Sequence, residues 1–146
     1  MRCLLDTNVV SEWVKPRPNP HVVAWLDSVD EEDVFLSAVT IGELRYGMAR
    51  LPAGGRRERL FAWLRDELLP RFETRVLAID TAVAEMWGDV VATADTRGRP
   101  IGAIDAYVAA VARVHELTLV TRNVADFDGV FDRIFDPWSG DPPPAS

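Results

Sequence analysis

Short apolar segments alternate with longer, helix-like segments along this chain, and that alternation restricts its fold more than any other feature. Four segments are predicted to be strands: Cys3–Asp6, Val34–Leu36, Val76–Ile79 and Thr118–Thr121. The segments between them show helical periodicity of apolar residues, which predicts helices over Asn8–Val14, Pro20–Ser28, Thr40–Arg50, Arg56–Leu69, Thr81–Asp95 and Ile101–Glu116. Strands that alternate with helices are typical of an α/β domain with a mostly parallel sheet.

Length and composition indicate one globular domain. The chain has 146 residues, and we expect the domain over residues 1–138 and a flexible tail over the proline-rich residues 139–146. The single cysteine, Cys3, excludes a disulfide framework and favours a reducing cytoplasm. We find no secretory leader and no apolar run of about 18 residues, so we expect a cytoplasmic protein without a membrane partner.

The net charge of −7 argues against a large basic surface that wraps nucleic acid. That argument weakens if the carboxylates converge on one site, because a divalent cation held there can bridge to phosphate. Fifteen of the sixteen basic residues are arginine, which suits phosphate and carboxylate oxygens, although a genomic bias in composition explains the same count. Charge alone therefore leaves a nucleic-acid substrate open.

The first predicted strand ends in Asp6, within the sequence LLDTNVV. Aspartate is a good N-cap, so the local interpretation of Asp6 is the cap of the helix that follows. Ligands of parallel sheets, however, bind outside the carboxyl ends of the strands. Asn123 and Asp126 follow the last predicted strand, so the order of elements gathers all three at one edge. Asp126 is either a supporting residue or part of an Asx turn, whereas the Asn123 amide oxygen can coordinate a hard cation.

Two further carboxylates have both a structural and a functional interpretation. Glu43 follows Thr40 by three residues, the spacing of a capping box, yet the same side chain could turn inward as a ligand. Asp105 is the only charged residue from Pro100 to Ala112, and its neighbours on that helix face are apolar. A carboxylate in that position needs a partner, which could be Arg122, the end of a neighbouring helix or a metal ion.

Asp6, Glu43 and Asp105 come from three distant segments, and no lysine lies near any of them. Carboxylates packed together repel one another unless a divalent cation neutralises them, and oxygen ligands favour Mg²⁺ or Mn²⁺ over zinc. His21 and His115 lack the spacing of metal ligands and are expected at the surface or in packing. Acidic sites of this kind usually act on phosphate esters, with a metal-activated water as nucleophile and a carboxylate such as Glu43 or Asp105 assisting its deprotonation.

Four motifs, in this order and spacing, resemble the PIN-domain ribonuclease toxins of the VapC type: LLDTNVVSE, SAVTIGELRYG, PIGAIDAYVAAVA and LVTRNVADF. The segment VVAWLDS and the ending FDPW are most similar to the FitB subgroup, and the resemblance runs from Met1 to about Trp138. It implies a three-layer α/β/α sandwich, a homodimer and cleavage of RNA that depends on Mg²⁺ or Mn²⁺. It also implies a cognate, DNA-binding antitoxin of the VapB or FitA kind.

The resemblance also implies roles for individual residues. Three of the family's acidic residues are matched by Asp6, Glu43 and Asp105. Polar positions that orient ligands or phosphate are matched by Thr7, Asn8 and Thr121. Asn123 stands where the family often has a fourth acid, which removes one negative charge from the expected site and puts the binding of a second metal in doubt.

Two other functions stay open. Asn123 favours a catalytically silent PIN module that binds RNA or protein without cutting it. The sequence DTNVV after the first strand also approaches the D-x-D-x-T motif of haloacid-dehalogenase-type phosphatases. That family needs a downstream lysine against the phosphoryl group, and Lys15, the only lysine, lies too close to Asp6 in sequence.

The apolar residues of one predicted helix, namely Val83, Met86, Trp87 and Val90, exceed what one small sheet can cover, so they predict a homodimer. The implied antitoxin is expected to place an arginine against Asp6 or Asp105, where a bidentate pair can form. Its apolar segment is expected on the helices at Thr40–Arg50 and Arg56–Leu69.

Overall fold

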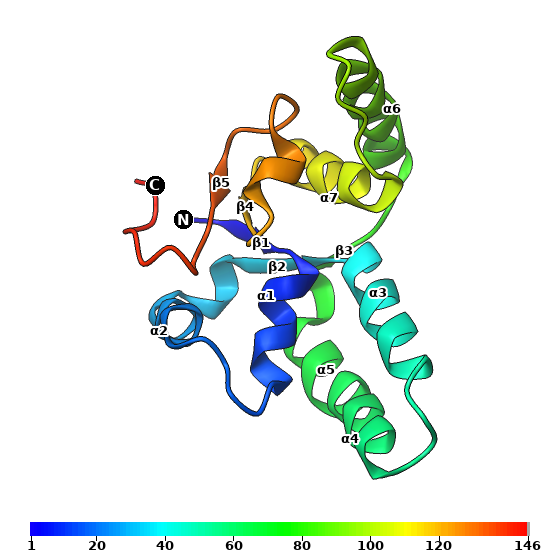
Figure 1. Cartoon of the computed structure of the whole chain (residues 1–146), viewed down its shortest axis with the longest axis vertical. Helices are drawn as coiled ribbons and strands as arrows, with labels where there is room; N and C mark the ends of the chain where they lie inside the picture. The colour runs from blue at the N-terminus through cyan, green and yellow to red at the C-terminus, as the bar shows by residue number, and fades with distance from the viewer. Residues whose placement is uncertain (146) are drawn as a thin grey trace.

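The computed structural model describes residues 1–145, and its centre is a sheet of five strands that all run parallel (Figure 1). The strands are β1 (Cys3–Leu5), β2 (Val34–Ser37), β3 (Val76–Leu77), β4 (Thr118–Val120) and β5 (Ile134–Phe135). Their order across the sheet is β3-β2-β1-β4-β5. The four predicted strands are confirmed with small shifts at their ends. Strand β5 is an addition, because two residues show no recognisable apolar period.

Every predicted helix is present, with some changes at the ends. The α-helices are α1 (Thr7–Ser11), α2 (Pro20–Ser28), α3 (Ala38–Ala49), α4 (Gly55–Trp63), α5 (Leu69–Phe72), α6 (Thr81–Thr96) and α7 (Ala103–Val114). Single 3-10 turns form at Glu12–Val14, Glu31–Asp33, Glu73–Arg75 and Val124–Phe127, and the last of these is η5. The helix expected over Arg56–Leu69 is divided, because a π-helical stretch at Leu64–Leu68 separates α4 from α5.

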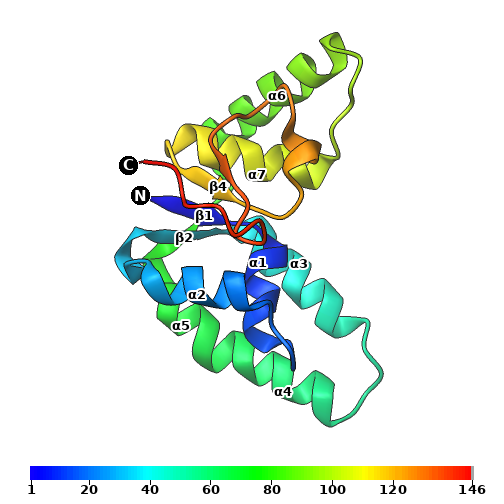
Figure 2. The ribbon, with the colours of Figure 1, turned by 60° about the vertical axis from the view of Figure 1, so that its left-hand side comes forward.

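Helices cover both faces of the sheet, which gives the three layers that the resemblance implies (Figures 1 and 2). Helices α1 to α5 pack on one face, and α6 and α7 pack on the other. Strand β1 shows how the sequence builds two cores, because successive strand residues point to opposite faces. Cys3 and Leu5 enter the core beneath α1 to α5, whereas Leu4 enters the core beneath α6 and α7.

Helix α7 is buried along most of its length, and this fixes the position of its first turn. Its fully buried side chains are small: Ala106, Val108, Ala109, Ala110, Val111 and Ala112. Asp105 directly precedes this run and therefore lies where the helix emerges at the edge of the sheet.

After β5, the described chain contributes one more side chain to the core. Trp138 packs against the first core, and residues 139–145 are exposed and form no helix or strand. Ser146 lies outside the described residues, and the domain boundary at 138 and the flexible tail stay predictions. Within residues 1–145, no helix combines the length and the hydropathy that crossing a bilayer requires.

Candidate active site

The predicted site residues lie just beyond the carboxyl ends of three neighbouring strands. Asp6 follows β1 directly, and Thr121 follows β4 directly. Strand β2 leads through Ser37 into α3, which carries Glu43, and α7 supplies Asp105 from its first turn. Because β2, β1 and β4 are parallel and adjacent, their ends meet at one edge of the sheet. This is the edge at which α/β proteins bind ligands.

Asp6 is 6% exposed and is held in place on both carboxylate oxygens. Its Oδ1 accepts a hydrogen bond from the Thr7 N–H at 2.8 Å, and its Oδ2 accepts one from the Thr121 hydroxyl at 2.8 Å. The first bond makes Asp6 the N-cap of α1, so the local interpretation is confirmed and is compatible with a functional one. Burial raises the pKa of Asp6, the two hydrogen bonds oppose that rise, and the nearby charge of Asp126 adds to it.

The Thr121 hydroxyl joins the loop after β4 to the loop after β1. It is fully buried, and besides donating to Asp6 it accepts from Asn8 Nδ2 at 3.3 Å and from the Asn123 N–H at 3.1 Å. Asn8 Oδ1 in turn accepts from the Arg122 N–H at 3.3 Å. Thr121 and Asn8 therefore hold the two loops, and with them Asp6, in fixed positions.

Glu43 is turned toward Thr7 and away from the start of its own helix. The Thr7 hydroxyl donates to Glu43 Oε1 at 2.5 Å and lies 3.2 Å from the hydroxyl of the buried Thr40. The predicted capping box is wrong, because α3 begins at Ala38 and its N-cap is Ser37, whose hydroxyl accepts from the Val39 N–H at 3.0 Å.

The Thr-x-x-Glu spacing has another cause. One helical turn places Thr40 and Glu43 on the same face of α3, and both meet Thr7 there. The contact of Thr40 with Thr7 is a part of the site that the sequence analysis missed. The only signal for it is that same spacing.

Asp105 is half-buried and, within residues 1–145, has neither a hydrogen-bond donor nor an ion-pair partner. Arg122, one of its expected partners, instead lies over the Trp138 ring at 5.4 Å from the centroid. Burial raises the pKa of Asp105 to about 6, together with smaller contributions from three neighbouring carboxylates, in decreasing order Asp6, Asp126 and Glu43. Asp105 therefore neither pairs with Arg122 nor caps a neighbouring helix in the described chain. Its negative charge is instead close to the charges of three other acids.

Asp126 and Asn123 lie at η5, on the open side of this cluster. Both are exposed, and the Asp126 side chain makes no hydrogen bond in the described part of the chain, so the expected Asx turn is not formed. Asp126 instead acts through its charge on Asp6 and Asp105. Position 123 contributes a backbone N–H to Thr121 and no carboxylate. Asp126 is thus the fourth acid of the cluster.

The donors of this cluster suit a divalent cation, since carboxylate oxygens are the hard ligands that Mg²⁺ and Mn²⁺ prefer. Asp6 keeps a lone pair on each oxygen beyond its hydrogen bonds, and both oxygens of Asp105 are free. Within residues 1–145, no three His, Cys, Asp or Glu side chains lie close enough together to share one ion directly. The Thr7 hydroxyl engages Glu43 Oε1, so Glu43 Oε2 is the oxygen left for a cation or a water ligand.

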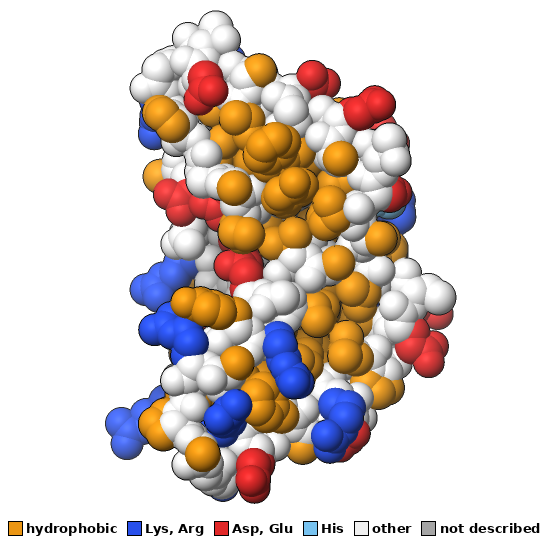
Figure 3. All heavy atoms as spheres, turned by 90° about the vertical axis from the view of Figure 1, so that its right-hand side faces the viewer, with side chains coloured by type: hydrophobic (Ala, Val, Ile, Leu, Met, Phe, Trp, Pro, Cys, Tyr) orange, Lys and Arg blue, Asp and Glu red, His pale blue; other side chains and the backbone are white. Residues whose placement is uncertain are grey.

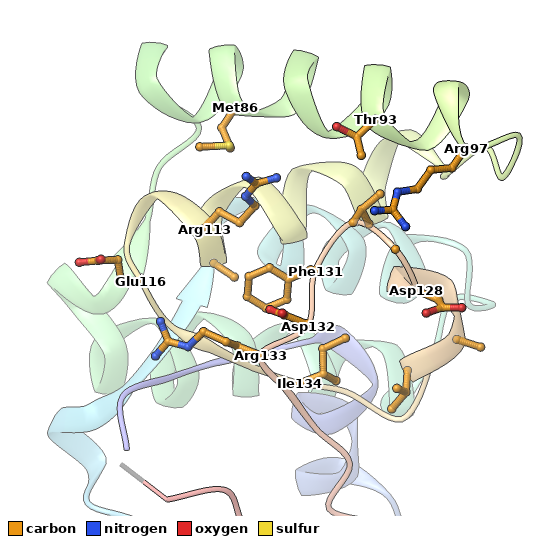
Figure 4. A pocket seen from close by; sticks show the side chains of 15 residues that line it. Met86, Thr93, Arg97, Arg113, Glu116, Asp128, Phe131, Asp132, Arg133 and Ile134 are labelled. Carbon is orange, nitrogen blue, oxygen red and sulfur yellow. The ribbon is translucent and has the colours of Figure 1, made fainter.

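A large hollow among the described residues lies elsewhere, between α6, α7 and the chain from η5 onward (Figure 4). Its volume is about 930 Å³, and it contains none of the four acids of the cluster. Its charged lining is balanced, with three arginines and three carboxylates: Arg97, Arg113, Arg133, Glu116, Asp128 and Asp132. The candidate active site is therefore the open edge of the sheet and not this hollow.

The apolar surface of α6 differs from the prediction. Val83 and Val90 are fully buried in the chain's own core, so the argument that they form a dimer surface is wrong. Trp87 is half-buried and stacks on Tyr107 with 5.2 Å between ring centroids. Figure 3 shows a band of apolar side chains down the face that α6, α7, α3 and α4 share. Two of the most exposed large apolar residues in the described chain are Tyr46 and Ile104.

Comparison with known proteins agrees with this architecture. A family model described as PIN domain matches residues 3–131, a span that contains every residue of the candidate site. Toxin FitB of Neisseria gonorrhoeae is 45% identical over 135 residues, which cover 92% of this chain and 97% of that protein. VapC ribonuclease Y4jK of Sinorhizobium fredii is 41% identical over 135 residues, which cover 92% and 96% of the two proteins.

A solved structure gives the same result in three dimensions. The structure of FitAB bound to an IR36 DNA fragment contains a chain that is 43% identical to this one, with a TM-score of 0.89. The match covers 93% of this chain and 95% of that one.

Proposed function

This chain belongs to the PIN-domain family of FitB- and VapC-type toxins, and from that premise we propose that it is an endoribonuclease dependent on Mg²⁺ or Mn²⁺ and the toxin of a type II toxin–antitoxin pair. The observation that carries the proposal is Asp105, an unpaired carboxylate whose pKa is raised to about 6 by burial and by three neighbouring acids. Acids gathered in this way destabilise a fold unless a cation joins them. Divalent cations also serve phosphodiester hydrolysis.

The proposed metal ligands are Asp6 and Asp105, with Glu43 binding directly or through water. When bound, Mg²⁺ or Mn²⁺ would stabilise negative charge on the scissile phosphate and acidify a water molecule. Glu43 or Asp105 would assist the deprotonation of that water as a general base. Neither histidine takes part in this scheme. His21 lies on α2, which carries none of the site residues, and His115 follows the end of α7 opposite to the one that carries Asp105.

The remaining polar residues position these acids. Thr121 fixes Asp6 Oδ2, and Asn8 fixes Thr121. Thr7 holds both Asp6 and Glu43, the first through its N–H and the second through its hydroxyl. Asn123 lies exposed beside them, where its amide can contact the RNA or a water ligand.

We also infer the partners from the family and the surface. A second copy would cover the part of the apolar band in Figure 3 that lies over α6 and α7. The antitoxin would be a DNA-binding protein of the VapB or FitA kind, with an arginine in the acidic edge and an apolar segment on α3, α4 and the helical turns after α4. We also propose that this protein acts in the cytoplasm, where it would meet an RNA substrate.

The test is cleavage of a panel of purified RNAs by the wild-type protein with Mg²⁺, with Mn²⁺ and with EDTA. We expect cleavage that EDTA abolishes and that Asp105→Asn reduces at least 100-fold. Asp89→Asn, an exposed aspartate on α6, is the matched control and should cleave like the wild type.

Two other results of the RNA cleavage assay would contradict the proposal. Cleavage that persists in EDTA, or full activity of Asp105→Asn, would overturn the proposed chemistry. RNA binding without any metal-dependent cleavage would favour the catalytically silent PIN module instead.

A further inference from the structure

Positive charge is unevenly distributed on this acidic chain. Residues 45–59, which comprise the end of α3, the next loop and the start of α4, contain five arginines and one carboxylate, Glu58. We name these arginines the arginine patch: Arg45, Arg50, Arg56, Arg57 and Arg59. None of the five makes an ion pair within residues 1–145. Figure 3 shows several Lys and Arg side chains in the lower half of the face that α3 and α4 share.

Aromatic rings hold part of the patch in place without neutralising it. Arg45 and Arg57 both lie over the Phe61 ring, with their guanidinium carbons 4.3 Å and 5.3 Å from its centroid. Arg50 lies 5.3 Å from the centroid of Tyr46, which is 64% exposed. Such contacts orient a guanidinium and leave its charge and most of its donors available. Arg57 Nε is even buried without an acceptor in the described chain.

No carboxylate in the described part of the chain neutralises the charge of these arginines. Helix α4 has no fully buried residue, and Arg56 and Arg57 lie in its first turn, where the helix dipole disfavours positive charge. The exposed side chains of Arg56 and Arg59 bind no acid in the described chain. A set of unpaired, partly oriented cations, two of which lie at an unfavourable helix N-terminus, indicates an anionic partner.

The patch continues from the candidate active site along α3. Tyr46 and Arg50 follow Glu43 by three and seven residues, so the three share one side of the helix. Seven residues of α-helix span about 10 Å. A strand bound at the acidic edge can therefore reach the arginines within a few nucleotides.

We propose that the arginine patch binds phosphate groups of the RNA strand beside the cleaved bond. This inference rests on the proposed function, and it explains how a chain with a net charge of −7 holds a polyanion. The hollow in Figure 4 has no excess of positive charge, because three arginines and three carboxylates line it. An antitoxin segment on α3 and α4 would cover the same arginines and exclude the RNA.

The test is the binding of a fluorescein-labelled, single-stranded 20-nucleotide RNA, followed by anisotropy in EDTA so that no cleavage occurs. The double variant Arg56→Gln, Arg59→Gln removes two exposed cations. For single strands each phosphate contact contributes about −0.7 to the slope of log K against log salt. The variant should therefore bind about 25-fold more weakly at 0.1 M salt, with a slope shallower by about 1.4.

A matched control has the same change in net charge. Arg97→Gln, Arg113→Gln removes two exposed arginines from the hollow in Figure 4 and should bind like the wild type. Circular dichroism checks that each variant is folded. Arg50→Gln, at the C-cap of α3 and thus independent of the start of α4, should weaken binding about fivefold.

The outcomes separate the two proposals. Equal losses of RNA affinity in the two double variants would overturn the inference, as would a failure of the wild type to bind RNA. It would also be overturned if the patch variant bound RNA normally but no longer bound the coexpressed antitoxin. In Mg²⁺ the patch variant should show a raised KM and an unchanged kcat. If the wild type binds RNA through the patch and never cuts it, the proposed nuclease fails and this inference stands.

Discussion

Replacing Asp105 by asparagine should stabilise the metal-free protein at pH 7.5, even though it destroys the proposed site. The carboxyl has an ordinary pKa of 3.8, and its pKa here is about 6. That rise corresponds to about 3 kcal/mol if solvent does not screen the charge. Asp105 is only half-buried, so screening reduces the expected gain on its removal to about 1 kcal/mol.

The pH dependence follows from the direction of the pKa change. Because the folded protein binds this proton more tightly than the unfolded chain does, Asp105 stabilises the fold below about pH 4. That contribution is lost as the pH rises through about 6. The advantage of Asp105→Asn should therefore be largest above pH 6.5, shrink as the pH falls and disappear near pH 4.

Thermal unfolding in EDTA between pH 4 and pH 8 measures this difference. For a chain of this length, 1 kcal/mol corresponds to a rise in Tm of about 4 °C. Asp89→Asn, the exposed control on α6, should leave Tm unchanged at every pH. An Asp105→Asn protein that is less stable than the wild type at pH 7.5, or a difference that does not vary with pH, would refute the reasoning.

Three further predictions concern the neighbouring residues. Thr121→Val should slow RNA cleavage about tenfold because Asp6 Oδ2 loses its 2.8 Å hydrogen bond, and Thr121→Ser should restore the rate; equal rates in both variants would contradict a positioning role. Ser37→Ala should lower the free energy of unfolding in urea by about 1 kcal/mol, since α3 loses its N-cap, and an unchanged value would contradict that assignment. Burial raises the pKa of the Cys3 thiol to about 12, so iodoacetamide should label Cys3 at pH 8 only after unfolding, and rapid labelling of the native protein would show that this thiol is accessible.

The strand and helix pattern could be predicted because its signals are local. A short, continuous apolar run defines β1, whose three residues are all buried. Capping residues define helices such as α2, where Asn19 is the N-cap and Pro20 begins the helix. Strand β5 could not be predicted, because its two residues form a strand only by pairing with β4. The same limit applies to the π-helical stretch at Leu64–Leu68, which no local signal marks.

The site shows a similar division. Asp105 could be found because a single charge in an apolar run needs an explanation from distant parts of the chain. The contact between Thr7 and Glu43 could not, since it joins two segments through tertiary packing, and the local capping rule gave a competing and incorrect assignment. The homodimer argument failed at Val83 and Val90 for a related reason: periodicity identifies an apolar face but does not say what covers it.

The central claim is that Asp6, Glu43 and Asp105 form one divalent-cation site at the edge of the sheet. A titration of Mn²⁺ followed by electron paramagnetic resonance at pH 7.5 tests it most directly, because free and bound Mn²⁺ give different signals. We expect saturable binding by the wild type and by Asp89→Asn, and affinities at least tenfold lower for Asp6→Asn and Asp105→Asn. Undiminished Mn²⁺ binding by Asp6→Asn and Asp105→Asn would contradict the account.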